Sequence, residues 1–218
     1  MEEPPTYAVG HLALGYLSGK AASKILKVTV NVPLLFLASI IPDADLLVPG
    51  LQHRGPAHST IISCLLFLPA FIFFGKRAAP YFIALIQHSL VGDYLTGGTG
   101  GTQLLWPVAS NWYGSEIKIT SLTNVFMEWT LFLTCITVML KTKDVWSLFQ
   151  HHPSNIILSI PILTVLLPTF LSFPLSVPLE LVIPHLTYLI LFALSALVDC
   201  KAILTKNQKG SRQHIFSR

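Results

Sequence analysis

The stretch NIILSIPILTVLLPTFLSFPLSVPL, residues 155–179, contains 25 residues and no charged side chain. The next stretch, LVIPHLTYLILFALSALV at 181–198, adds 18 residues without Asp, Glu, Lys or Arg. A helix of about 20 mostly apolar residues crosses the hydrocarbon core of a bilayer, so each stretch predicts a membrane-spanning helix. Pro174 and Pro178 lie between the two stretches and favour a tight turn there.

The composition of the whole chain agrees with a membrane protein. Of its 218 residues, 52% are hydrophobic and 11% charged, and the mean hydropathy is +0.64. Soluble domains carry about a quarter charged residues, so this composition excludes a disordered chain, a secreted disulfide scaffold and a typical cytosolic enzyme. The net charge is +4, and five basic residues lie in the last 18 positions, a surplus too local to indicate nucleic-acid binding.

Further apolar segments precede these two. They cover residues 7–27, 28–42, 57–75, 78–92 and 119–140. The sequence therefore predicts an all-α integral membrane bundle of six to seven transmembrane helices. Its predicted domains are a membrane-embedded unit, residues 1–200, and a basic cytoplasmic tail, residues 201–218.

The loop charges predict how the bundle is oriented, because short cytoplasmic loops carry the Lys and Arg excess. If the tail is cytoplasmic, seven crossings place the acidic N-terminus outside. The basic residues of the other cytoplasmic loops are then Lys20, Lys24, Lys27, Lys76, Arg77, Lys141 and Lys143, and the external segments hold only Arg54 and Lys118. This pattern predicts a multi-pass protein of the cell membrane with its C-terminus in the cytoplasm.

Ionisable residues gather at the outer ends of the predicted helices. Those at the helix ends are Asp43, Asp45, His53, Arg54, His58 and Asp93, and those within two or three turns are His11, His88, Glu128 and His185. Ionisable groups inside a membrane are costly unless they are paired or bound to a ligand. The sequence thus predicts a polar site that faces outside.

Carboxylates and imidazoles together suit a divalent ion, zinc first and manganese or iron as alternatives, with no thiolate required. Two such ions a few ångströms apart would clamp an attacking hydroxide and a phosphoryl oxygen. Arg54, followed by Gly55, would bind the phosphate through its planar guanidinium. Alternatively, Asp43, Asp45 and Arg54 form an ion-pair network that only holds the loop.

Several histidines also have a structural interpretation. His11 lies near small residues and would pack between helices. His185 follows a proline in an apolar helix, where a structural role is favoured, and His53 would merely precede Arg54 in a loop. His151 and His152 fall in a cytoplasmic loop and are interpreted as solvated surface.

Four short motifs carry a resemblance to a known family. They are IPDAD (41–45), HRGPAHS (53–59), His88 with DYLTG (93–97), and LLWP (104–107). Over roughly residues 8–130 the chain resembles the membrane-bound metal-dependent hydrolases described as LexA-binding, inner-membrane-associated hydrolases, which are distantly similar to zinc-dependent phospholipases C. The resemblance implies that His11, Asp43, His58, His88 and Asp93 ligate metal, and that Asp45 bridges two ions or orients a ligand.

The chain departs from that pattern at two places. His88 and Asp93 are five residues apart where four are expected, and on a regular helix this turns them about 140° from each other. Gly92 would permit a bulge or an early helix end that realigns them. Asn124 stands where the phospholipase pattern has histidine, which leaves Glu128 as a general base or as a ligand of a looser site.

The function expected from these residues is hydrolysis of a phosphoester in a lipid or lipid-linked substrate at the outer leaflet, with Arg54, Glu128 and Asp45 as the catalytic residues. The alternative is an ion or metal transporter that uses the intramembrane His, Asp and Glu. A transporter usually places its site near the midplane between repeats, whereas this chain has no internal repeat and keeps its polar residues on one side. A membrane scaffold with a structural metal is the third possibility.

Overall fold

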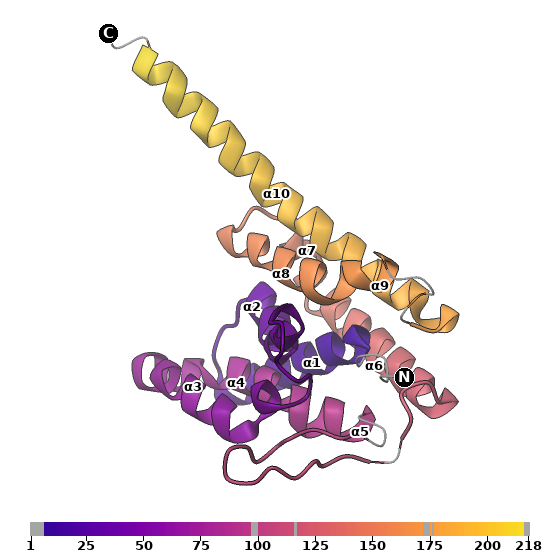
Figure 1. Ribbon diagram of the computed structural model, residues 1–218. Helices are drawn as coiled ribbons and strands as arrows, with labels where there is room; N and C mark the ends of the chain where they lie inside the picture. Colours follow the sequence, from indigo (N-terminus) through magenta and orange to yellow (C-terminus); the bar gives the residue numbers. More distant parts are fainter. Residues whose placement is uncertain (1–6, 97–99, 116, 172–174, 176, 216–218) are drawn as a thin grey trace.

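The computed structural model describes residues 7–96, 100–115, 117–171, 175 and 177–215, with side chains as far as Cys200. Helices make up the regular structure of this part of the chain (Figure 1). The only pairing of extended backbone within it is an isolated bridge between Thr102 and Tyr113. The predicted all-α fold is therefore confirmed.

The main helices are α1 (Ala8–Leu26), α2 (Val32–Ala38), α3 (Thr60–Phe74), α4 (Ala79–Gln87), α6 (Leu122–Lys141) and α10 (Val182–Ile215). An irregular helix over Pro153–Leu171 contains α8 (Ser159–Pro161) and α9 (Leu167–Leu171). The shorter elements are the 3₁₀ turns Ile41–Leu47, Pro56–His58, Gly75–Arg77 and Leu179–Leu181, the π-helical turn His88–Asp93, α5 (Tyr94–Thr96) and α7 (Asp144–Leu148).

Polar side chains start several of these helices. Ser59 precedes α3 and Ser121 precedes α6, and each hydroxyl accepts a hydrogen bond from a backbone N–H of the first turn. Asn31 does the same for α2, where its side chain accepts from Leu34 N at 3.1 Å. Such caps satisfy amide groups that have no partner inside the helix.

Four helical segments are long and apolar enough to cross a membrane: Thr60–Arg77, Leu122–Lys141, Pro153–Leu171 and Leu179–Cys200. The predicted count of six to seven crossings is not confirmed within the described residues. Segment 28–42 forms only the seven-residue α2, which is about 10 Å long and is followed by the 3₁₀ turn that starts before Pro42. Of the two prolines expected at the last turn, Pro174 lies outside the described residues and Pro178 precedes the turn Leu179–Leu181.

Helix α1 lies at the centre of the bundle and packs against α2, α4, α6 and α10. The ring of its Tyr16 stacks on Phe36 of α2, with the ring centroids 5.5 Å apart. The ring centroid of Phe36 in turn lies 4.9 Å from that of Phe192 in α10. Helix α3 is different, because it packs against α4 and leaves apolar side chains such as Leu66 and Phe73 exposed. In a membrane protein, such a face is the one that contacts lipid.

The π-helical turn His88–Asp93 joins α4 to α5 and lies against the first turns of α1. Gly92 is the contact point, since a Cβ at this position would overlap the imidazole ring of His11. Glycine is therefore the residue that lets α1 and the π-helical turn approach this closely.

Gly92→Ala is expected to lower the thermal midpoint of the detergent-purified protein. Alanine in place of a helical glycine normally stabilises the folded protein by about 0.5–1 kcal/mol. A lower stability of this variant would therefore result from overlap of the new Cβ with the buried His11 ring. Leu90→Ala is the matched control, because Leu90 is an exposed residue of the same turn and should change the midpoint little. A higher midpoint for Gly92→Ala would contradict the close packing.

Candidate metal centre

Short irregular elements, rather than the long helices, position most of the predicted site residues. Asp43 and Asp45 lie on the 3₁₀ turn Ile41–Leu47, and His58 ends the turn Pro56–His58 just before α3. His88 and Asp93 are the first and last residues of the π-helical turn. Together with His11 of α1 and Arg54, these side chains are buried in one cluster, as the sequence predicts.

The loop that carries Arg54 is held by the segment after α5. Arg54 has a left-handed backbone (φ 60°), a conformation that costs a residue with a side chain roughly 1–2 kcal/mol. Its carbonyl oxygen accepts hydrogen bonds from Gln103 N at 2.9 Å and Thr102 Oγ1 at 3.2 Å. Ser59 Oγ donates to Trp106 O at 2.5 Å on the same segment. These contacts fix the side chain of Arg54 toward Asp93, with Nε 3.6 Å from Oδ1.

The five-residue spacing of His88 and Asp93 is resolved by the π-helical turn. A π-helical turn contains one residue more than an α-helical turn, because its hydrogen bonds join residues five apart. Both side chains therefore lie on the same side, with His88 Nε2 3.4 Å from Asp93 Oδ2. The realignment that the sequence predicts at Gly92 is confirmed.

Four ligand-type atoms converge at the middle of the cluster: Asp43 Oδ1, His58 Nε2, His88 Nε2 and Asp93 Oδ2. Asp43 Oδ1 is 3.5 Å from His58 Nε2 and 3.3 Å from His88 Nε2. Asp93 Oδ2 lies 3.3 and 3.4 Å from the same two nitrogen atoms, which are 3.3 Å apart. An ion about 2.0–2.1 Å from each of four tetrahedral ligands separates neighbouring ligand atoms by about 3.3–3.4 Å. Asp43, His58 and His88 thus offer three ligand atoms with the spacing of a zinc site, and Asp93 Oδ2 lies at a similar distance from both imidazoles.

Neighbouring groups orient both imidazole rings. His88 Nδ1 is 2.6 Å from Ser39 O, and because a carbonyl can only accept, Nδ1 carries the proton and Nε2 keeps its lone pair. His58 Nδ1 lies 3.2 Å from Asp45 Oδ2, so Asp45 contacts the ring on the side opposite Nε2. This arrangement is typical of histidines that bind metal. Of the two roles that the resemblance implies for Asp45, the geometry favours orienting His58.

The cluster has an excess of negative charge. Asp43, Asp45 and Asp93 contribute −3 and Arg54 contributes +1, which leaves −2 when the imidazoles are neutral. Burial opposes the charged form of Asp43, but contacts with His88 and His58 outweigh it and hold the pKa of Asp43 well below its ordinary value. Burial also opposes a charged His58, yet the surrounding carboxylates, Asp93 first, raise the pKa of His58 to about 10. The site therefore attracts positive charge, and a divalent ion that displaces the proton of His58 would balance the remaining charge of −2.

His11 and His53 contact different members of the cluster. His11 stacks on the His88 ring at 4.0 Å, and its Nε2 is 3.6 Å from Asp93 Oδ1. His53 Nδ1 is 3.0 Å from Asp45 Oδ1. The sets His11–His88–Asp93 and Asp45–His53–His58 each have geometry that could hold an ion. The contact of His53 with Asp45 favours a site role over the loop interpretation.

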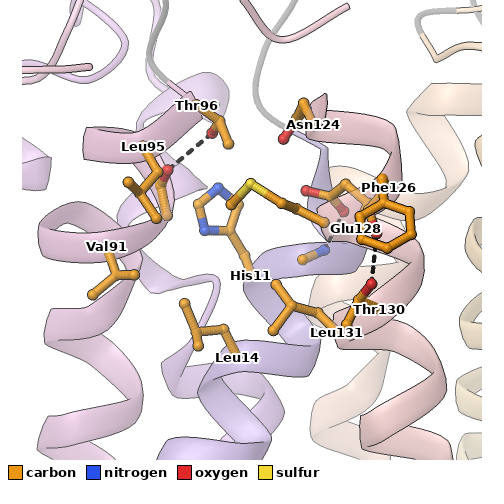
Figure 2. A pocket seen from close by; sticks show the side chains of 13 residues that line it. His11, Leu14, Val91, Leu95, Thr96, Asn124, Phe126, Glu128, Thr130 and Leu131 are labelled. Atoms are coloured by element: carbon orange, nitrogen blue, oxygen red, sulfur yellow. Dashed lines mark hydrogen bonds between the residues drawn. The ribbon is translucent and has the colours of Figure 1, made fainter. Parts of the chain in front are cut away.

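Glu128 lies outside the central cluster. It projects from α6 toward the start of α1, where Oε2 accepts a hydrogen bond from Gly10 N at 2.5 Å. Asn124, one turn earlier, donates to Ile119 O at 2.8 Å. Figure 2 shows Glu128 and His11 facing the same pocket, which has a volume of about 280 Å³. No candidate metal group among the described residues includes Glu128, so its placement favours a role in the pocket.

The remaining histidines lie away from the cluster. His185 is buried in α10, where Nδ1 is 2.8 Å from Leu181 O, in agreement with a structural role. His152 is exposed, as predicted. His151 is also exposed, as predicted, and its Nδ1 lies 2.7 Å from the buried carboxylate of Asp199. The sequence gives no signal for this contact, which joins two segments far apart in the chain.

The contact that sequence reasoning misses entirely is the one between His88 and the carbonyl of Ser39. Every residue has a backbone carbonyl, so no residue type marks this partner. Only the packing of α2 against α4 brings the two groups together.

Comparison with known proteins gives a family but no activity. The family model for the YdjM inner membrane protein matches residues 7–173, a range that contains every residue of the cluster. No curated protein and no solved structure matches the chain, and no similarity to hydrolases or to zinc-dependent phospholipases C is found. The match agrees with the four helices of membrane-spanning length and with a lipid environment around them. The chain belongs to the YdjM inner membrane protein family.

Proposed function

We propose that this protein is a membrane-bound, metal-dependent hydrolase that cleaves a phosphoester of a lipid or lipid-linked substrate. The observation that supports the proposal is the group Asp43, His58 and His88, whose ligand atoms have the spacing of a zinc site, with Asp93 Oδ2 3.3 and 3.4 Å from the two imidazoles. The buried guanidinium of Arg54 lies beside these atoms, where it can bind a phosphate.

Zinc is the ion that best suits two imidazoles and two carboxylates in this spacing, and manganese or iron would require additional ligands. His11 is placed to supply one, or to share His88 and Asp93 with a second ion. A divalent ion bound here would lower the pKa of a water molecule and polarise a phosphoryl oxygen. Asp45 orients His58, and Arg54 holds the phosphate. Glu128 faces the pocket beside His11, where it can exchange a proton with the substrate.

The distribution of charge supports an external site. The cluster lies where α1, α3 and α6 begin, whereas basic residues lie where these helices end, at Lys20, Lys24, Lys76, Arg77 and Lys141. Lys20 forms an ion pair at 2.5 Å with Asp144, just beyond α6, so the basic ends of α1 and α6 meet. Because cytoplasmic loops carry the positive residues, the proposal places the cluster at the outer leaflet and the C-terminus in the cytoplasm.

Cysteine labelling in intact cells tests this orientation. Gln52→Cys lies in the cluster loop and Gln150→Cys lies beyond α7 at the basic end, and both positions are exposed. In a background with Cys64, Cys135 and Cys200 replaced, a membrane-impermeant thiol reagent should label position 52 and spare position 150 until the cells are lysed. The reverse pattern would overturn the orientation.

Metal analysis of detergent-purified protein tests the centre itself. We expect about one divalent transition ion per chain, since four ligand atoms converge on one point. Asp43→Ala and His88→Ala should each remove most of the metal, because alanine leaves no ligand atom at either position. Asp45→Asn should weaken metal binding by about 10- to 100-fold, the usual effect of losing a group that orients a ligand.

His152→Ala is the matched control for these variants, because His152 is exposed and lies outside the cluster. It should retain the metal content of the wild type. Absence of metal from the wild type, or equal loss from the control, would refute the centre.

Turnover in detergent separates a hydrolase from a transporter. A hydrolase needs no ion gradient, so metal-loaded protein should release phosphate or a phosphorylated headgroup from a lipid phosphate. Arg54→Lys keeps the positive charge but loses the planar guanidinium with its paired N–H donors. We therefore expect kcat/KM to fall by about tenfold or more while the metal is retained. Gradient-dependent ion uptake into sealed vesicles that requires His88, without product from a panel of lipid phosphates, would instead support the transporter.

A further inference from the structure

The pocket beside His11 is a groove with two helical walls and a floor. The π-helical turn and α5 form one wall, and α6 forms the other (Figure 2). Helix α1 packs against both walls and closes the bottom with His11 and Leu14. With a volume of about 280 Å³, the groove is at the small end of the range for ligand pockets, which suits one slender ligand.

The groove is polar at one end and apolar at the other. Glu128, His11 and Thr96 lie at the polar end, near the start of α6. Leu14 and Leu131 lie at the apolar end, farther along α1 and α6. The seven-residue step from Asn124 to Leu131 corresponds to about 10 Å along α6, a helix long and apolar enough to cross a membrane, so the change in polarity follows the direction that crosses the bilayer.

The groove opens toward the lipid. Phe126 on its rim is 73% exposed and belongs to the outer face of α6, together with Leu122 and Leu133. Val91 on the opposite rim is 38% exposed. A hydrocarbon chain can therefore enter sideways from the bilayer without passing the polar end.

His11 connects the groove to the metal centre. One residue lines the groove at its polar end and also stacks on His88 and contacts Asp93. The ring stays there because Gly92 has no side chain to displace it. A ligand that fills the groove thus places its polar end next to the cluster.

We propose that the groove binds the single hydrocarbon chain of the substrate, an alkyl or prenyl phosphate, and directs its phosphate to the centre. The inference rests on the proposed function for the chemistry at the phosphate. Binding of the hydrocarbon chain does not depend on that function. A polar end beside ligands for a divalent ion and an apolar end open to lipid match an amphiphile with one tail.

Photo-crosslinking tests the groove directly. The probe is hexadecyl phosphate with a diazirine near the middle of its hydrocarbon chain, within the length of the groove, added to the metal-loaded protein in lipid nanodiscs. Mass spectrometry should locate most of the label on residues 91–96 and 124–131, and unlabelled hexadecyl phosphate should compete while inorganic phosphate should not. Label spread evenly over the lipid-facing helices, or competition by hexadecane alone, would overturn the proposal in favour of ordinary lipid contact.

Groove-filling variants give the matched comparison. Leu131→Trp and Val91→Trp narrow the apolar end from opposite walls, and each should lower labelling by about tenfold, a normal effect of altering an apolar pocket. Leu133→Trp lies on the same helix but faces lipid and should not change labelling. Unchanged thermal midpoints would show that the variants are folded. Because the two substitutions lie on different walls of the groove, they test it independently. Labelling that persists in both groove variants contradicts the inference.

The outcomes distinguish the groove from the proposed activity, because crosslinking requires no turnover. Labelling of the groove without formation of product would support binding of the hydrocarbon chain in the groove and refute the hydrolase. If product forms, Leu131→Trp should lower kcat/KM for hexadecyl phosphate while leaving a short-chain phosphoester unaffected. An equal fall in kcat/KM for both substrates, or turnover without labelling of the groove, would refute binding of the hydrocarbon chain in the groove and still support the hydrolase.

Discussion

The burial of three carboxylates at one point is the constraint on which the rest of the structure depends. Asp43, Asp45 and Asp93 are almost inaccessible, and a buried charge is tolerated only when partners compensate it. Arg54 supplies one fixed positive charge and the histidines supply donors, so four segments distant in sequence must meet within a few ångströms. The irregular turns that carry these residues follow from this requirement, because straight helices alone would not aim all the side chains at one point.

Much of this site is predictable from the sequence, because its residues occur in two compact motifs and a third with unusual spacing. The pairs Asp43–Asp45 and His53–His58 signal a site before any fold is known, and the five-residue step from His88 to Asp93, a departure from the expected four, is accommodated by the π-helical turn that contains Gly92. The sequence does not predict which carboxylates bind an ion and which orient a histidine. Whether a carboxylate binds an ion or orients a histidine depends on differences of about an ångström, which residue spacing does not determine.

The helix count is harder to predict for a different physical reason. Hydropathy measures how apolar a segment is, but not whether lipid or protein surrounds it. Helix α1 is apolar because it lies at the centre of the bundle, and α2 is apolar because Leu35 and Phe36 fill the core, although seven residues cannot cross a bilayer. Helix α3, with few buried residues, shows the opposite case of an apolar surface that faces outward. Segments of both kinds look alike in the sequence.

The placement of Glu128 connects the fold with the proposed chemistry. A carboxylate in a spanning helix is costly, and the hydrogen bond from Gly10 compensates only part of that cost. A purely structural role would be met as well by an uncharged side chain, so its presence beside His11 favours contact with a polar ligand. In our proposal the tail of the substrate binds in the groove, away from the reacting atoms, and its binding energy holds the phosphate between Glu128, His11 and the centre. Binding far from the reacting bond can then promote the reaction, because it fixes the reacting groups before the bond breaks.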